Sequence, residues 1–374
     1  MSCAKPSHLR DYVKRIFVLL VLVSTPLANC LSLEPFDQMP EFSLRGVDGK
    51  IYTKEFFKDK DLLAVVFLSN HCRVSQIFQK TLIKLTNTFQ EKKIGIMAIS
   101  PNYEEAILPD ELAYSDLGDS FVEMQKRAFR MKYNFIYLFD GDKQVFTQKV
   151  GVKITPTVYI FNKKRQLIYI GRIGNHETPE KIETSDLYKT LMSNLNNDEG
   201  KFKRTKVFGT SIKYIDDLVL AEQVRMRYAN ETIKIVSTDD RKLKFYINHL
   251  TGKPKLFYVW KVTDKEPREN LITISGLYKI FRKRGLKVIT VCVAEENTKE
   301  KALDLLKQAQ LSSTNFVVSG KNISPLTTIM PNDIKRITPF YRLLSSDGKM
   351  QESGNGKIVK DNLRVQVLNS LNEE

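Results

Sequence analysis

A buried strand that ends at a cysteine and continues into an amphipathic helix is the feature that most constrains this fold. The apolar run 62–68 stops shortly before Cys72, and apolar residues recur at helical spacing over 73–89. This order predicts a strand, a tight turn and a helix, with the Cys72 thiol in the first helical turn. Free backbone N–H groups and the positive helix end favour the thiolate there, and Arg73 adds a nearby cation.

Cys72 has no partner for an internal disulfide. The position three residues on is Ser75, so the motif is Cys-x-x-Ser. Cys3 and Cys30 belong to the N-terminal segment, and Cys292 lies in the apolar run 287–294, where it is expected to fill a buried strand. A count of four such cysteines excludes a disulfide-stapled secreted fold.

The chain is long and basic. Its 374 residues favour two domains, and Lys plus Arg number 59 against 43 Asp plus Glu. The cationic residues are dispersed, and no zinc-finger or aromatic ribonucleoprotein motif accompanies them. We therefore expect a solvated basic surface and no nucleic-acid partner.

The N-terminal residues 1–30 are typical of an export signal. Lys14 and Arg15 precede the apolar run 16–23, and small residues follow as far as Cys30. The stretch 27–30 also resembles a bacterial lipoprotein box, in which Cys30 would be the acylated first residue. Lipidation, ordinary cleavage and an uncleaved anchor remain open. The expected location is the periplasm or cell envelope, with any membrane anchoring through the N-terminus.

The first half alternates strands with helices. Strands are expected near a hairpin at Asp48-Gly49 and over the apolar runs, and helices are expected behind Cys72 and after Ser120, which opens a capping box. Such alternation, closed by a final hairpin, predicts a mixed sheet flanked by helices over residues 36–195. The expected strands are 41–44, 51–52, 62–68, 94–99, 135–139, 157–161 and 166–170.

Four pieces of this half, in this order and spacing, resemble the redoxin branch of the thioredoxin superfamily. They are Asn70-His71-Cys72, residues 135–140, residues 151–157 with Thr155-Pro156, and residues 169–172. This branch is related to peroxiredoxins of the AhpC/TSA type and to membrane-tethered bacterial thiol-disulfide oxidoreductases. The resemblance implies a cis Thr155–Pro156 bond beside the active cysteine, with the Thr155 backbone presented to an extended substrate.

Departures from that branch affect the expected chemistry. Relatives often carry a second cysteine where this chain has Ser69, or in a later Gly-Cys-x-Ile-Lys element where it has Thr210. Val65 replaces the upstream proline of peroxiredoxins proper. Both resolving thiols are therefore missing, so an external thiol must serve. His71 is either a base that polarises the thiol or an ordinary loop histidine.

The second half, residues 251–374, is predicted to be a degenerate copy. Ile337-Thr338-Pro339 repeats the earlier Ile-Thr-Pro, and the run 260–264 stands where Cys-x-x-Cys would lie but holds no cysteine. The fold class expected is therefore α/β, with tandem thioredoxin-like folds. Residues 196–250 are expected to connect the domains, with a helix over 215–228 and two strands over 231–246.

Two classes of function remain open. The first is an oxidoreductase that uses Cys72, assisted by His71, Arg73 and Ser75, on a disulfide or hydroperoxide, with protein or low-molecular-weight thiols as partners. The second is a non-catalytic binding or scaffold protein of the cell envelope. The sequence lacks Cys-x-x-Cys-His, and its four histidines are scattered, so neither haem nor a metal is expected.

Overall fold

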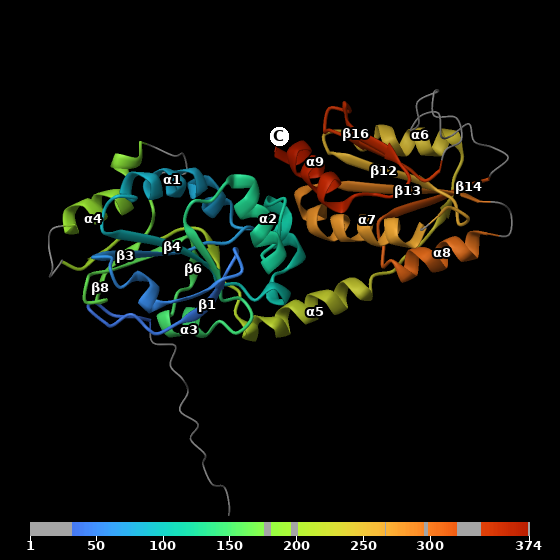
Figure 1. The fold of residues 1–374 in the computed structure, drawn as a ribbon. Coiled ribbons are helices and arrows are strands. Elements are labelled where there is room, and N and C mark those ends of the chain that lie inside the picture. Colours follow the sequence, from blue (N-terminus) through green and yellow to red (C-terminus); the bar gives the residue numbers. More distant parts are fainter. Residues whose placement is uncertain are drawn as a thin grey trace, which may run out of the picture.

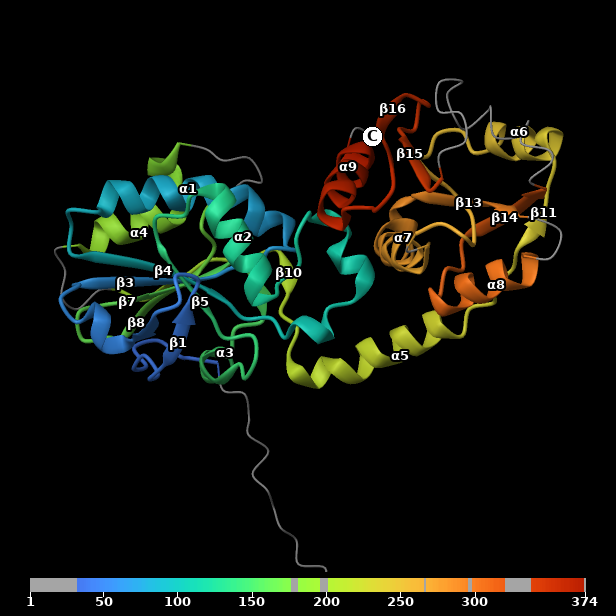
Figure 2. The same ribbon diagram turned by 45° about the vertical axis from the view of Figure 1, so that its right-hand side comes forward.

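The computed structural model describes residues 32–175, 181–195, 201–265, 267–294, 298–319 and 338–372. They form two lobes, each built on its own sheet, which one helix connects (Figures 1 and 2). The predicted signal 1–30 and the first residues of the predicted connecting region, 196–200, lie outside the described residues. Within the described ranges, every helix is too short or too polar to cross a membrane.

The first lobe is built on an eight-stranded mixed sheet with the order β2-β1-β5-β4-β3-β7-β8-β9. Its strands are β1 (Ser43–Gly46), β2 (Ile51–Thr53), β3 (Leu62–Phe67), β4 (Ile94–Ser100), β5 (Ile136–Phe139), β6 (Ile154–Thr155), β7 (Thr157–Phe161), β8 (Leu167–Gly171), β9 (Lys203–Arg204) and β10 (Thr210–Ser211). Its helices are α1 (Arg73–Phe89), α2 (Phe121–Met131), α3 (Val145–Val150) and α4 (Asp186–Asn194). The short strands β6 and β10 pair only with each other.

The predicted strand and helix around Cys72 are confirmed, because their apolar patterns match the layers that cover them. Alternate β3 residues face opposite sides of the sheet. Leu62, Ala64 and Val66 pack against α1, α2 and α4. Leu63, Val65 and Phe67 pack against α3 and the segment that precedes β1. Every β3 residue is buried, which explains a continuous apolar run without alternation.

The second lobe is built on a six-stranded sheet with the order β11-β14-β13-β12-β15-β16. Its strands are β11 (Val236–Ser237), β12 (Lys255–Trp260), β13 (Lys287–Ala294), β14 (Thr314–Ser319), β15 (Phe340–Leu344) and β16 (Met350–Asn355). Its helices are α6 (Asp240–Asn248), α7 (Pro267–Phe281), α8 (Lys299–Gln308) and α9 (Lys360–Asn372). Helices α7, α8 and α9 cover one face, and α6 covers the other.

Five strands of each sheet share one order and one set of directions. In the first lobe, β3 runs parallel to β4, β4 runs parallel to β5, and β3 pairs antiparallel with β7, which pairs antiparallel with β8. In the second lobe β12, β13, β14, β15 and β16 repeat these relations in the same sequence. A cis X–Pro bond precedes β7 at Pro156 and β15 at Pro339.

The predicted connecting region contributes to both sheets. β9 pairs with β8 of the first sheet, β11 pairs with β14 of the second, and α5 (Leu218–Ala229) links the lobes (Figure 1). The prediction of two strands over 231–246 is wrong, because only β11 is extended and α6 follows. Asp239 accepts a hydrogen bond from the Lys242 amide at 2.8 Å, which stabilises the start of α6.

The segment between β4 and α2 joins the lobes (Figure 2). Its 3-10 helix η3 (Pro109–Tyr114) contacts α7, and Ala113 is buried within the core of the second lobe. The Arg284 guanidinium donates to the Ala113 carbonyl at 2.7 Å, and Lys283 pairs with Asp110 at 2.6 Å. The lobes are therefore held together by a loop of the first lobe seated in the second.

Candidate functional site

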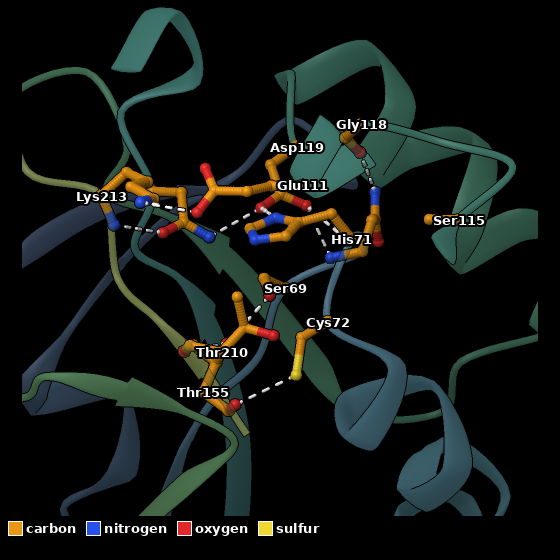
Figure 3. Close-up of polar contacts among 12 residues, drawn as sticks. Ser69, His71, Cys72, Glu111, Ser115, Gly118, Asp119, Thr155, Thr210 and Lys213 are labelled. Carbon is orange, nitrogen blue, oxygen red and sulfur yellow. Dashed lines mark hydrogen bonds and ion pairs between the residues drawn. The ribbon is translucent and has the colours of Figure 1, made fainter. Parts of the chain in front are cut away.

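The Cys72 thiol lies at the N-terminus of α1, as predicted. Cys72 is the N-cap residue, and its sulfur accepts a hydrogen bond from the Ser75 amide at 3.4 Å. The thiol donates to the Thr155 carbonyl at 3.0 Å (Figure 3). Cys72 is 0% exposed. The resting thiol is therefore held by two backbone groups and is shielded from solvent.

Thr155 joins the cysteine turn to the short strand β6. Its hydroxyl is 2.9 Å from the Ser69 hydroxyl, and the Thr155–Pro156 peptide bond is cis. Strand β6 pairs antiparallel with β10, with Thr155 opposite Thr210. The structure thus brings together three segments: the turn with Ser69 and Cys72, strand β6 with Thr155, and strand β10 with Thr210 (Figure 3).

A buried pair of charged side chains fixes the turn before Cys72. The His71 Nδ1 atom lies 2.7 Å from an Asp119 carboxylate oxygen. The other oxygen accepts from the backbone amides of Asn70 at 2.6 Å and His71 at 3.2 Å, and Asn102 donates to the carboxylate at 2.6 Å. Figure 3 shows the His71 ring pointing toward Asp119 rather than toward the Cys72 sulfur.

The two pKa shifts identify this pair as an ion pair. Burial lowers the pKa of His71, but the charge of Asp119 and the hydrogen bond to it raise that pKa by more, to a net value above 6.5. Burial raises the pKa of Asp119, but His71 and the amide donors lower it further, to below 3.8. Both groups are therefore charged between these two limits.

The remaining predicted site residues differ in their burial and in their contacts. Ser75 is buried, and its hydroxyl accepts from the Ser69 amide at 3.4 Å. Pro156 is buried beside the site. Arg73 begins α1 with an exposed side chain, and no polar contact among the described residues joins it to the thiol. His71 has a partner in Asp119 and none in Cys72 within the same ranges.

Sequence reasoning missed Asp119 and Asn102. Both lie in the long segment after β4, where turn-forming residues are common and no periodic pattern marks a role. Asp119 immediately precedes Ser120, the N-cap of α2, and this position gave no separate signal. Only the fold brings Asp119 next to His71, 48 residues earlier.

Cys292 has the predicted core position. It is 0% exposed in β13, the strand between β12 and β14. Burial, together with the charge of Asp264, raises the pKa of Cys292 to about 12. Within the described residues, no three histidine, cysteine or acidic side chains are grouped so as to hold a metal ion.

A family model and several solved structures are similar to parts of this chain. The AhpC/TSA family model matches residues 35–170. A hypothetical protein from Sinorhizobium meliloti 1021 is 23% identical, with a TM-score of 0.42 over 49% of this chain and 96% of that chain. An uncharacterized conserved protein from Geobacillus kaustophilus is 27% identical, with a TM-score of 0.42 over 48% and 92%.

A peroxidoxin, BcpB, from Mycobacterium tuberculosis is 14% identical, with a TM-score of 0.28 over 36% of this chain and 83% of that chain. A search of curated proteins gave no match. The sheet order, the Cys72 turn and the family match then support one assignment. The first lobe has a thioredoxin-like fold, and its residues 35–170 match the AhpC/TSA family model.

Proposed function

We propose that this chain is an exported thiol-redox protein in which Cys72 is the reacting group. The observation that carries the proposal is the contact of the Cys72 thiol, at the start of α1, with the Thr155 carbonyl. Both residues lie within the range 35–170 that matches the AhpC/TSA family model. Export is supported by the basic and apolar N-terminal sequence 1–30.

Two oxidants fit this chemistry. With a hydroperoxide, the thiolate sulfur attacks the terminal oxygen, the O–O bond breaks, and water or an alcohol leaves after taking up a proton. Cys72 is oxidised to the sulfenic acid, and the peroxide is reduced. With a disulfide, attack breaks the S–S bond, forms a mixed disulfide and releases one thiolate.

Return to the thiol needs an external partner. The other cysteine among the described residues, Cys292, lies in the core of the second lobe. An external thiol therefore attacks the sulfur of the Cys72 sulfenic acid, releases water and forms a mixed disulfide. A second external thiol then attacks that mixed disulfide, which frees the Cys72 thiol and joins the two external thiols as a disulfide. Protein or low-molecular-weight thiols can fill this role.

The first test of this proposal compares the two cysteines. We expect iodoacetamide to label Cys72 at least about tenfold faster than Cys292 in the native protein at about pH 8, because alkylation requires the thiolate and its access to the reagent. Burial and Asp264 hold the Cys292 pKa near 12. Peptide mass spectrometry of the labelled protein, with Cys72→Ser as the control, measures both rates.

Slow labelling of both cysteines, together with no oxidation of Cys72 by hydrogen peroxide, would contradict the redox proposal. The non-catalytic binding or scaffold function would then be favoured, with Cys72 retained only as the N-cap of α1. Equal labelling of Cys72 and Cys292 would contradict the core position assigned to Cys292.

We also propose that the second lobe is a second thioredoxin-like domain that acts as a scaffold. The shared order and directions of five strands support the relationship. The scaffold role rests on hydrogen bonds from the second lobe to the segment before α2. Arg364 of α9 is 3% exposed and donates to the carbonyls of Ser115 at 3.0 Å and Leu112 at 3.2 Å.

The held segment leads directly to the candidate site. Three residues after Ser115, the Gly118 carbonyl accepts from the Asn70 side chain at 2.7 Å. Asp119 follows, and its carboxylate binds the amides of Asn70 and His71. The second lobe thus positions the carboxylate that orders the turn before Cys72, without contributing a thiol of its own.

Replacing Arg364 with methionine should loosen this segment and lower the pKa of His71 toward its ordinary value. The carbonyls of Leu112 and Ser115 lose their buried donor, so Asp119 is positioned less firmly beside His71. The Asp119 charge then raises the pKa of His71 by less. Glu111 also raises the His71 pKa, and Lys213 lowers it. Titration of the His71 ring protons by NMR measures the change.

The same substitution at Arg227, on α5 with an exposed side chain, is the control and should leave the His71 titration unchanged. A folded Arg364→Met protein with the wild-type His71 titration would contradict the scaffold role, whatever the reactivity of Cys72.

A further inference from the structure

The chain pairs one of its own strands with the backbone beside Cys72. β10 runs antiparallel to β6, with Thr210 opposite Thr155 and Ser211 opposite Ile154. The Ile212 amide donates to the Lys153 carbonyl at 2.9 Å and continues the pairing. Figure 3 shows Thr210 next to Thr155, the residue that contacts Cys72. The edge of β6 is therefore already filled.

The pairing of β10 with β6 requires the chain at Gly209 to pass very close to the Thr155 backbone. Gly209 has φ +148°, and a Cβ atom there would overlap the Thr155 carbonyl oxygen. This is the same oxygen that accepts the Cys72 thiol hydrogen bond. Only glycine allows the chain to pass so near this oxygen, because any side chain would push β10 away from β6.

The strand is anchored at its far end. Ile212 is buried in the core between the sheet and α3. The Lys213 amide donates to Asn102 at 2.8 Å, and the Lys213 carbonyl accepts from the Tyr103 amide at 2.9 Å. Asn102 in turn donates to Asp119 at 2.6 Å. β10 is thus tied to the network that orders the Cys72 turn.

An extended peptide would need the edge that β10 occupies. Peptides bind a strand edge by adding backbone hydrogen bonds, and specificity comes from their alternate side chains. Thr155 faces Thr210 on that edge, and its carbonyl also accepts from Cys72. A polypeptide disulfide therefore cannot pair with Thr155 while β10 is in place.

We propose that the segment Gly209–Ile212 is a specificity element that closes the Cys72 site to polypeptides and leaves small hydroperoxides as its oxidants. This inference rests on the proposed function, because it names the substrate class of the same thiol. It also changes the role expected for Thr155. The Thr155 backbone was expected to bind an extended substrate, but in the structure it pairs with the chain's own strand β10.

The geometry of the two reactions favours the hydroperoxide. Attack on a disulfide aligns three sulfur atoms and needs room for a carbon substituent on each sulfur of the substrate. The terminal oxygen of a hydroperoxide carries only hydrogen, so one small atom must reach the sulfur. Cys72 is 0% exposed and Ser69 is 2% exposed, which leaves little room for more. The Ser69 and Thr155 hydroxyls bond each other at 2.9 Å, and Thr155 donates to the Thr210 carbonyl at 3.4 Å, so either hydroxyl must give up one of these bonds to donate to a peroxide oxygen.

The test compares two oxidants on Gly209→Val and on wild type. Hydrogen peroxide should convert Cys72 to a sulfenic acid, which dimedone traps, in both proteins, because this reaction does not need the β6 edge. Its rate on each protein is the reference for the second oxidant, since a side chain at position 209 also contacts the Thr155 carbonyl that accepts from Cys72. A short cysteine peptide carried as its mixed disulfide with thionitrobenzoate should react at least about tenfold faster with Gly209→Val, because the β6 edge is then open. Release of thionitrobenzoate measures this exchange.

Two controls and a second variant accompany the test. Gly252→Val replaces a glycine with φ +69° and no neighbour within 4 Å, so it controls for backbone strain alone. Gly209→Ala is a milder second variant if the valine protein does not fold. Ser193→Cys in a Cys72→Ser background supplies an exposed thiol on α4 that calibrates both reagents.

Equal peptide exchange in wild type and Gly209→Val would overturn the specificity element while leaving Cys72 as a redox thiol. Faster reaction of wild-type Cys72 with the peptide than with peroxide, relative to the exposed thiol, would overturn the substrate class. Reaction with neither oxidant in either protein would overturn the proposed function, and the inference with it.

Discussion

Replacing Asp119 with asparagine is expected to lower the free energy of unfolding by about 3–5 kcal/mol, because it removes one partner of a buried ion pair. The Asp119 carboxylate accepts from the amides of Asn70 and His71, from His71 Nδ1 and from Asn102. An asparagine has one oxygen for these donors, and its NH₂ group would face some of them. The turn before Cys72 should therefore become disordered first.

The cost of Asp119→Asn should depend on pH in a defined way. The His71 pKa is raised above 6.5, so its contribution to stability is complete below 6.5 and is lost as the pH rises through the raised value. The Asp119 pKa is lowered below 3.8, so its contribution is present above 3.8 and is lost as the pH falls through the lowered value. The difference between variant and wild type should be largest between these limits.

Guanidinium unfolding, followed by far-ultraviolet circular dichroism at a series of pH values, measures this difference. Asp239→Asn, a change at the exposed start of α6, is the control and should cost much less. A cost for Asp119→Asn that is small at every pH, or that grows steadily above the His71 pKa, would mean that the two side chains are not a buried ion pair.

Local patterns predicted the elements around the site, and contacts distant in sequence supplied its chemistry. The bounds of α1 follow from amphipathic spacing over 73–89, and β3 follows from a continuous apolar run. The pairing of His71 with Asp119 spans 48 residues, and that of Thr155 with Thr210 spans 55. Neither pairing leaves a periodic signal in the chain.

Segment 231–246 shows how a local pattern can mislead. Its apolar residues alternate with polar ones at the start, which favours a strand. Beyond β11, however, Asp239 caps a helix, and Leu243 reaches the core from that helix. Strand β11 pairs with β14 through only two residues. The rest of the segment is helical because α6 buries Leu243 against the sheet.

Among the residues that the structure describes, no second thiol lies near Cys72, and supplying one gives the largest expected change in chemistry. By the proposed chemistry, we expect a Cys72 sulfenic acid in wild type to wait for an external thiol, because the site is buried. Ser75 lies one helical turn on, and its amide is 3.4 Å from the Cys72 sulfur. A thiol placed there is within reach of the oxidised sulfur.

We therefore expect Ser75→Cys to convert Cys72 from a persistent sulfenic acid to an internal disulfide. The introduced thiol attacks the oxidised sulfur, one water leaves, and the S–S bond forms. After hydrogen peroxide, trapping by dimedone should fall by at least about tenfold, because intramolecular attack outruns the reagent. Intact-protein mass spectrometry should show the loss of two hydrogens. Ser193→Cys, an exposed position on α4, should trap dimedone at Cys72 as wild type does. Undiminished trapping in Ser75→Cys would show that the first turn of α1 does not present residue 75 to the Cys72 sulfur.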